Sequence, residues 1–92
     1  MGKWEIEVTR RFEKDFKSLP RDVQERVIVV VESLSKNPYI GSPLRGTPYR
    51  KVRVGDYRVI YYVFKEEHKI VLMTIIHRGK GYKWLTRLSV LL

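Results

Sequence analysis

Five side chains in the second part of the chain could form a cationic site with a phenol beside it. They are Lys51, Arg53, Arg58, Arg78 and Tyr82. In the run 49–54, strand alternation places Val52 and Val54 on a core-facing side, so Lys51 and Arg53 must project together from the opposite side. Taken singly, each of the five would be an ordinary exposed residue of a sheet. Because antiparallel strands bring their ends side by side, we expect the five to converge on one concave surface.

Cations and a phenol are sufficient for cleaving RNA through its own 2′-hydroxyl. That reaction needs a base for the hydroxyl, stabilisation of a charge-rich phosphorane, and a proton for the leaving 5′-oxygen. Crowding by neighbouring arginines would favour the neutral form of Lys51, which could then act as the base. Arginine stays protonated and suits phosphate binding, as for Arg53 and Arg58. Tyr82 could stack on a base or take part in proton transfer.

Further cationic or titratable side chains are candidates for binding RNA beside this site. They are Arg45, Arg50, His77, Lys80 and Lys83. His77 is also a second candidate for acid–base work, with a structural role at a strand end as the alternative. Other chemistries have little support, because the proposed site has no pair of carboxylates and the chain has no cysteine. Two histidines are too few for a zinc site, so we expect no metal and no cofactor.

The charge of the chain is distributed unevenly. Residues 1–35 contain seven Lys/Arg and seven Asp/Glu, whereas residues 36–92 contain twelve Lys/Arg and three acids, so the net charge of +9 belongs to the second part. Such a field favours a polyanionic partner, with nucleic acid ahead of a membrane surface. A solvated basic surface without function is the alternative. The sequence shows no signal peptide and no apolar run long enough to span a membrane, which predicts a cytoplasmic protein without a membrane partner.

Hydropathy periods predict a single α+β domain over residues 1–92. Helical spacing of apolar residues favours two helices, although the β-branched run 27–31 could also be a strand. The expected elements, in order, are a strand around 4–8, a helix from about Arg10 to Ser18, a helix from Pro20 to Leu34, a loop at 37–48, strands at 49–54, 57–65 and 69–77, and a tail that is helical from Tyr82. Gly55-Asp56 predicts a type II′ turn, and Glu66-Glu67 a second tight turn. We expect the N-terminal strand and both helices to pack on an antiparallel sheet that contains a C-terminal three-stranded meander, with its other face open to a partner.

Two motifs of the chain resemble the RelE/ParE superfamily of type II toxins. The first is the early segment 12–20, FEKDFKSLP, and the second runs from Leu44-Arg45-Gly46 through YRKVRVGDYRVIY at 49–61 to His77-Arg78 and Tyr82. The likeness covers nearly the whole chain and implies the RelE-like microbial RNase fold. It is more specific for the superfamily than for a branch.

The RelE branch of that superfamily implies a ribosome-dependent endoribonuclease that cuts mRNA without a metal. Its functional positions fall on the five side chains named first, with Arg53 at a position that is often lysine and with an unusually tight hairpin turn. Only Lys51 then remains as a cationic base. The alternatives are a ParE-like poison of DNA gyrase that acts by protein contact, and a non-catalytic relic that binds RNA.

Family likeness also implies a cognate antitoxin beside the ribosome and mRNA as partners. The antitoxin would be acidic, or would carry an acidic docking segment, and would form a toxin–antitoxin hetero-oligomer. The stripe Leu85, Leu88 and Leu92 could contact it, although docking of that stripe on the toxin's own core is favoured.

Overall fold

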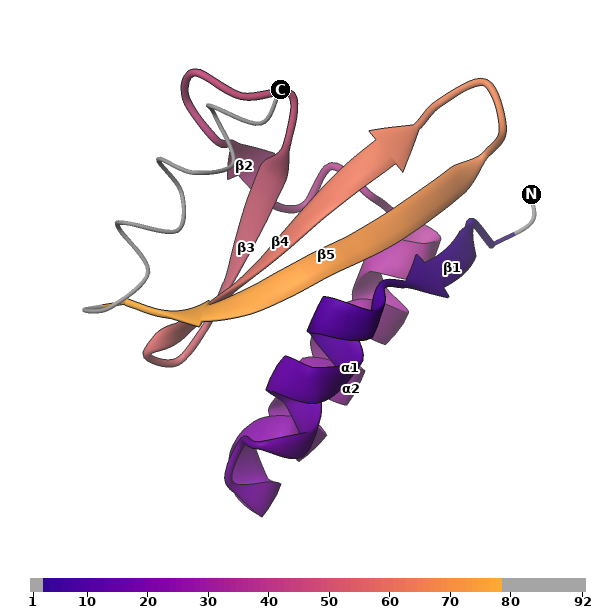
Figure 1. The fold of residues 1–92 in the computed structure, drawn as a ribbon. Coiled ribbons are helices and arrows are strands. Elements are labelled where there is room, and N and C mark those ends of the chain that lie inside the picture. Colours follow the sequence, from indigo (N-terminus) through magenta and orange to yellow (C-terminus); the bar gives the residue numbers. More distant parts are fainter. Residues whose placement is uncertain (1–2, 79–92) are drawn as a thin grey trace.

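A five-stranded sheet carries two helices on one of its faces in the computed structural model of the protein (Figure 1). The structure describes residues 3–78. Its elements are β1 (Glu5–Val8), α1 (Arg10–Lys17), α2 (Arg21–Lys36), β2 (Ser42–Pro43), β3 (Arg50–Val54), β4 (Tyr57–Phe64) and β5 (Lys69–His77). We call the sheet face covered by α1 and α2 the helix face, and the opposite one the outer face. The expected C-terminal helix from Tyr82 lies outside the described residues.

The strand order is β1-β5-β4-β3-β2. The three-stranded meander β3-β4-β5 is antiparallel, as expected, and the α+β class is confirmed. The sheet as a whole is mixed, because β1 pairs in parallel with β5, where Ile6 lies opposite Ile70. The chain leaves β1 through both helices and reaches the far edge of the sheet at β2, which falls inside the expected loop. The apolar strand β5 is therefore an interior strand, between β1 and β4.

Both helices follow from their end signals and apolar stripes. The Thr9 side chain caps α1 by accepting a hydrogen bond from the Phe12 N–H (3.0 Å). Pro20 precedes α2, where its missing N–H has no cost. The β-branched run 27–31 is helical, because Val27 and Leu34 lie on one stripe that is buried against the sheet.

Two tight turns connect the strands of the meander. Gly55 has a φ of 61° between the paired residues Val54 and Tyr57, as a type II′ turn requires. The second turn is centred on Glu66-Glu67 and ends at His68, whose φ of 55° is unusual for a residue with a side chain. The His68 ring stacks on Trp4 with 4.0 Å between ring centroids, which gives this conformation a tertiary contact.

Two apolar clusters fix the orientation of the strands. The larger cluster lies on the helix face and consists of Phe12, Val27, Leu34, Val54, Val59, Tyr61, Ile70, Leu72 and Ile75. A smaller cluster lies on the outer face and consists of Leu44, Tyr49, Ile60 and Ile76. The outer face is therefore only partly open, because the segment before β3 covers some of it.

A hydrogen bond from the fully buried Tyr61 anchors the loop before β2. Its hydroxyl donates to the Pro38 carbonyl at 2.7 Å. We expect Tyr61→Phe to lower the free energy of unfolding by about 1–2 kcal/mol, because a buried carbonyl loses its donor. Urea denaturation would measure this loss. The matched change Tyr62→Phe, on the outer side of the same strand, should stay within about 0.5 kcal/mol; equal losses would contradict an anchoring role.

Candidate nucleic-acid interface

Three of the expected cationic side chains share the outer face of the β3–β4 hairpin. Val52 and Val54 pack into the helix-face cluster, so Lys51 and Arg53 project from the other side of β3. Arg53 lies directly opposite Arg58 in the strand register. Residues opposite one another in a ladder point to the same face. The structure thus brings Lys51, Arg53 and Arg58 together, as alternation along β3 predicted.

These three residues line a hollow beside the short edge strand β2. The hollow has a volume of about 310 Å³, and its remaining lining residues are Ile40, Gly41, Ser42 and Val52. No carboxylate lines it. Within residues 3–78, Lys51 and Arg58 form no ion pair, and the Arg53 Nε donates to the Gly55 carbonyl at 3.0 Å. The hollow therefore presents uncompensated positive charge, which suits an anion.

One wall of the hollow is held by contacts that leave no room for a side chain at Gly41. A Cβ atom there would lie 2.2 Å from the Lys51 carbonyl oxygen and 2.7 Å from the Tyr61 hydroxyl. The Arg50 guanidinium donates to the Gly41 carbonyl at 2.9 Å and lies over the Tyr39 ring, 5.2 Å from its centroid. Glycine at this position therefore lets the loop approach β3 closely.

Arg50, an expected RNA-binding residue, accordingly points away from the hollow. Its position in the register, opposite the buried Tyr61, puts it on the helix side of β3. It contacts the backbone of the wall, so of the three nearby arginines Arg50, Arg53 and Arg58 only the last two share the face of Lys51. Arg50 remains a candidate for RNA contact only as a prediction.

The other expected residues lie at three different places. Arg78 is exposed at the end of β5, where its N–H donates to the Asp56 carbonyl at 2.7 Å, beside the β3–β4 turn. The His77 ring meets Tyr57 edge-on, 5.1 Å between centroids, and Tyr57 packs against the helix-face cluster. His77 therefore leaves β5 on the side opposite to Arg58. Arg45 is exposed in the turn after Leu44. The remaining three, Lys80, Tyr82 and Lys83, lie outside the described residues.

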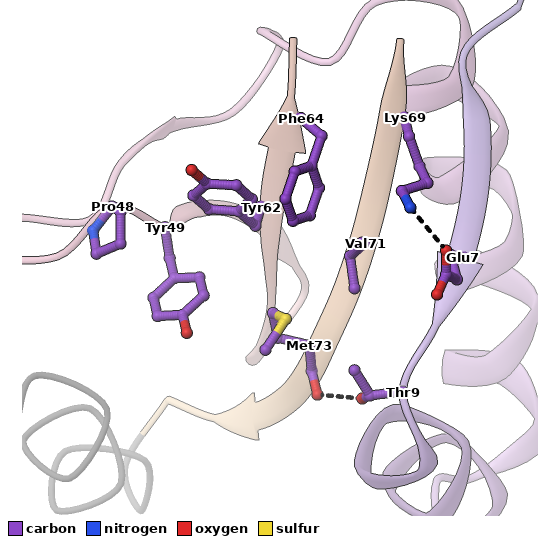
Figure 2. A pocket seen from close by; sticks show the side chains of 9 residues that line it. All are labelled: Glu7, Thr9, Pro48, Tyr49, Tyr62, Phe64, Lys69, Val71 and Met73. Carbon is purple, nitrogen blue, oxygen red and sulfur yellow. Dashed lines mark hydrogen bonds and ion pairs between the residues drawn. The ribbon is translucent and has the colours of Figure 1, made fainter. Parts of the chain in front are cut away.

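A second, apolar hollow on the outer face was not expected from the sequence. It has a volume of about 460 Å³ and is lined by Glu7, Thr9, Pro48, Tyr49, Tyr62, Phe64, Lys69, Val71 and Met73 (Figure 2). The rings of Tyr49, Tyr62 and Phe64 form a row of edge-on contacts, with 6.0 Å and then 4.6 Å between centroids. Alternation along β4 could have predicted this hollow, because Tyr62 and Phe64 lie on the same, outer side of the strand as Ile60. We call this hollow the aromatic groove.

Lys69 places a fixed positive charge at the rim of the aromatic groove. Its amine lies 3.1 Å from a Glu67 carboxylate oxygen and 3.2 Å from one of Glu7. Hydrogen bonds to Glu67 and then to Glu7 raise the pKa of Lys69 above its usual value. Residues 3–78 contain no group of three or more His, Cys, Asp or Glu that could hold a metal. In the same part of the chain, no helix is long and apolar enough to cross a membrane.

The fold places the chain in a class of small α+β proteins with two helices on a mixed sheet. The isolated RelE toxin of E. coli has this fold, with a TM-score of 0.74 over 97% of this chain and 99% of that one, at 19% identity. RelE in the RelBE2 toxin–antitoxin complex of Mycobacterium tuberculosis superposes with a TM-score of 0.77, at 26% identity over 87% of this chain and 97% of that chain.

Sequence comparison agrees with the structural likeness. A putative toxin RelE1 of Methanocaldococcus jannaschii is 32% identical over 88 residues, covering 88% of this chain and 97% of the relative. The family model for the ParE toxin of type II toxin–antitoxin systems matches residues 6–82. The chain therefore belongs to the RelE/ParE superfamily and is a RelE-like toxin of the type II toxin–antitoxin class, which confirms the resemblance seen in the sequence.

The close approach at Gly41 can be tested by adding one methyl group. We expect Gly41→Ala to lower the free energy of unfolding by about 1–3 kcal/mol, because the new Cβ meets backbone rather than a movable side chain. Chemical denaturation would measure the loss. Ser42→Ala, next in the chain and exposed, is the matched control and should change stability by less than about 0.5 kcal/mol. An unchanged Gly41→Ala protein would contradict the packing described for this wall.

Proposed function

We propose that the protein cuts mRNA on the ribosome, using the 2′-hydroxyl of the RNA as nucleophile and no metal. The observation that carries this proposal is the acid-free hollow in which Lys51, Arg53 and Arg58 share one face of a rigid hairpin. A phosphodiester that enters this hollow would meet the guanidinium groups of Arg53 and Arg58 and the amine of Lys51, all carried by paired strands. Fixed charge of this kind stabilises a transition state that gains negative charge.

The three cations would have different roles in the reaction. Arg53 and Arg58 are directly opposite across the hairpin and would bind the non-bridging oxygens, since guanidinium groups form paired hydrogen bonds to phosphate. Lys51 is the one of the three that can lose a proton, and it would accept the proton of the 2′-hydroxyl. Arg78, at the same end of the sheet as the hairpin turn, would add a further positive charge near the leaving 5′-oxygen, which would take its proton from water or from a phenol. Tyr82 stays a candidate for stacking or proton transfer from sequence alone.

A cognate antitoxin is the second partner in this proposal. The M. tuberculosis RelE relative was solved in complex with its antitoxin, which supports a toxin–antitoxin hetero-oligomer here as well. The aromatic groove offers an apolar surface for such a chain, with Phe64 38% exposed at one side. An acidic segment of the antitoxin would in addition neutralise the cationic hollow.

Poisoning of DNA gyrase is the second candidate, because the family model that matches residues 6–82 is that of ParE toxins. Under that function the protein would act by surface contact and would need no proton-transferring residue. The three cations would then be ordinary charges of the outer face. Cleavage of RNA therefore requires a side chain at position 51 that can accept a proton, whereas poisoning of gyrase does not.

Lys51→Arg tests whether Lys51 acts as a proton acceptor or only as a positive charge. We expect it to lower the rate of mRNA cleavage by about 100-fold or more, because arginine keeps the charge but cannot act as a base. Affinity for RNA should not fall, because arginine keeps a positive charge at this position. Primer extension on ribosome-bound mRNA would give the rate, and induction in cells would show whether growth arrest is lost.

Lys65→Ala is the matched control for that experiment, since it removes an exposed cation from the far turn of the meander. It should leave cleavage unchanged. Retained cleavage in Lys51→Arg would overturn the role of Lys51 as base. An absence of cuts with the unaltered protein, together with inhibition of gyrase supercoiling, would replace the nuclease by the second candidate; RNA binding with neither effect would indicate a non-catalytic relic.

Antitoxin binding can be tested in the aromatic groove. We expect Phe64→Asp to weaken binding of the antitoxin encoded beside the toxin gene by at least about tenfold, because a charge would be buried at an apolar contact. Ile28→Asp places the same charge on an exposed apolar residue of α2, 54% exposed, and serves as control. Calorimetric titration would compare the two variants. Equal affinities would exclude the aromatic groove as the binding surface.

A further inference from the structure

Strand β5 does not alternate along its whole length. Leu72 and Ile75 are three residues apart, yet both pack into the helix-face cluster. In the register, Leu72 lies opposite Tyr61 and Thr74 lies opposite Ile60. Met73 therefore has no residue of its own opposite it on β4. This is a β-bulge, which inserts one residue into the strand. Every later side chain of β5 therefore points to the opposite face from the one it would have in a regular strand.

The bulge determines the face on which β5 carries its last side chains. After it, Ile76 belongs to the outer-face cluster and lies opposite Arg58. Arg78 lies just past the end of β5, but its N–H donates to the Asp56 carbonyl at 2.7 Å and so extends the pairing of β5 with β4. The same alternation then puts Arg78 on the side of Arg58. In an unbulged strand, the even-numbered residues after Ile70 and Leu72 would all point to the helix face, and Arg78 with them.

Helix α1 supplies the hydrogen-bond partners that the bulge requires. The Thr9 hydroxyl donates to the Met73 carbonyl at 2.7 Å (Figure 2), while it accepts the capping bond from Phe12. The Asp15 carboxylate accepts from the Thr74 hydroxyl and, at 3.1 Å, from the Ile75 N–H. Groups that a bulge removes from the ladder would otherwise be left unsatisfied in a part-buried place.

We infer that Thr9 and Asp15 are positioning residues, which hold the β5 bulge and thereby keep Arg78 on the face of Arg58. Asp15 acts on β5 from α1 on the helix face, and Thr9 acts from the segment between β1 and α1. Neither side chain lines the cationic hollow. The catalytic consequence of this inference rests on the proposed function, but the placement of Arg78 does not. Asp15 is held in turn by an ion pair with Arg11, 3.3 Å from its Nε.

The test compares the full-length chain with Asp15→Ala by NMR and by cleavage assay. In Asp15→Ala, hydrogen exchange of the Ile75 amide should accelerate at least about tenfold, because its acceptor is gone. The cross-strand contact between Arg58 and Ile76 should weaken in nuclear Overhauser spectra as the register slips. Cleavage should lose about 10- to 100-fold in kcat while KM for programmed ribosomes stays within about twofold, since misplaced groups cost rate rather than binding.

Two further variants and one control keep the test informative if Asp15→Ala folds poorly. Thr74→Val removes one hydroxyl at constant shape and should give the same changes more weakly. Asp15→Asn keeps one carbonyl acceptor and should restore the Ile75 protection and most of kcat. Val23→Ala, in the half-buried stripe of α2, should lower Tm comparably without altering either the Arg58–Ile76 contact or kcat.

Unchanged Ile75 exchange and an intact Arg58–Ile76 contact in Asp15→Ala would overturn the inference, whatever happens to cleavage. Equal losses of kcat in Val23→Ala would also overturn it, because general destabilisation would then account for the effect. If the unaltered chain cuts no RNA but Asp15→Ala still releases the bulge, the positioning role stands and the proposed nuclease falls.

Discussion

Burial of one sheet face against two helices determines where the side chains of β3 and β4 can point. Val54, Val59 and Leu72 are each buried in the helix-face cluster. Once they are, alternation forces Arg53 and Arg58 out of the other face, and the two-residue turn at Gly55 keeps them opposite one another. A slip of one residue would bury cations and expose valines. The energy that stabilises the core therefore also maintains a cluster of like charges that would repel one another if left to themselves.

The segment between α2 and β3 gives the outer face its two distinct hollows. Gly41, held against β3, forms a wall of the cationic hollow, whereas Pro48 and Tyr49 line the aromatic groove. Between them, Leu44 packs on Ile60 and Ile76 and closes part of the sheet. A segment with little regular structure thus divides a flat surface into a polar part and an apolar part. The polar part suits the phosphates of RNA, and the apolar part suits apolar side chains of an antitoxin.

Periodicity in the sequence predicted most of the fold and the part of the site that lies on β3 and β4. The helices, the meander and the shared face of Lys51 and Arg53 follow from apolar spacing together with helix-end and turn signals. Two features could not be predicted. The parallel pairing of β1 with β5 depends on which edge of the sheet remains free after the meander forms. The bulge in β5 could not be predicted because residues 70–76 are almost all apolar and show no alternation of polar and apolar residues. His77, expected with the site, consequently lies beside Tyr57 on the other side of β5. Alternation along β3 placed Arg50 on the same side as Val52, which is the helix side. Its positive charge nevertheless led to the expectation that it lies on the surface and binds RNA.

In the proposed reaction, the RNA's own 2′-hydroxyl attacks a phosphate held by Lys51, Arg53 and Arg58. Analysis of the ends produced on ribosome-bound mRNA tests it most directly, combined with a message that carries a single 2′-deoxynucleotide on the 5′ side of the cut. Attack by the 2′-hydroxyl should leave a 2′,3′-cyclic phosphate and a 5′-hydroxyl, and the deoxy substitution should abolish that cut alone. Ends with a 3′-hydroxyl and a 5′-phosphate, or undiminished cleavage of the substituted message, would contradict the mechanism.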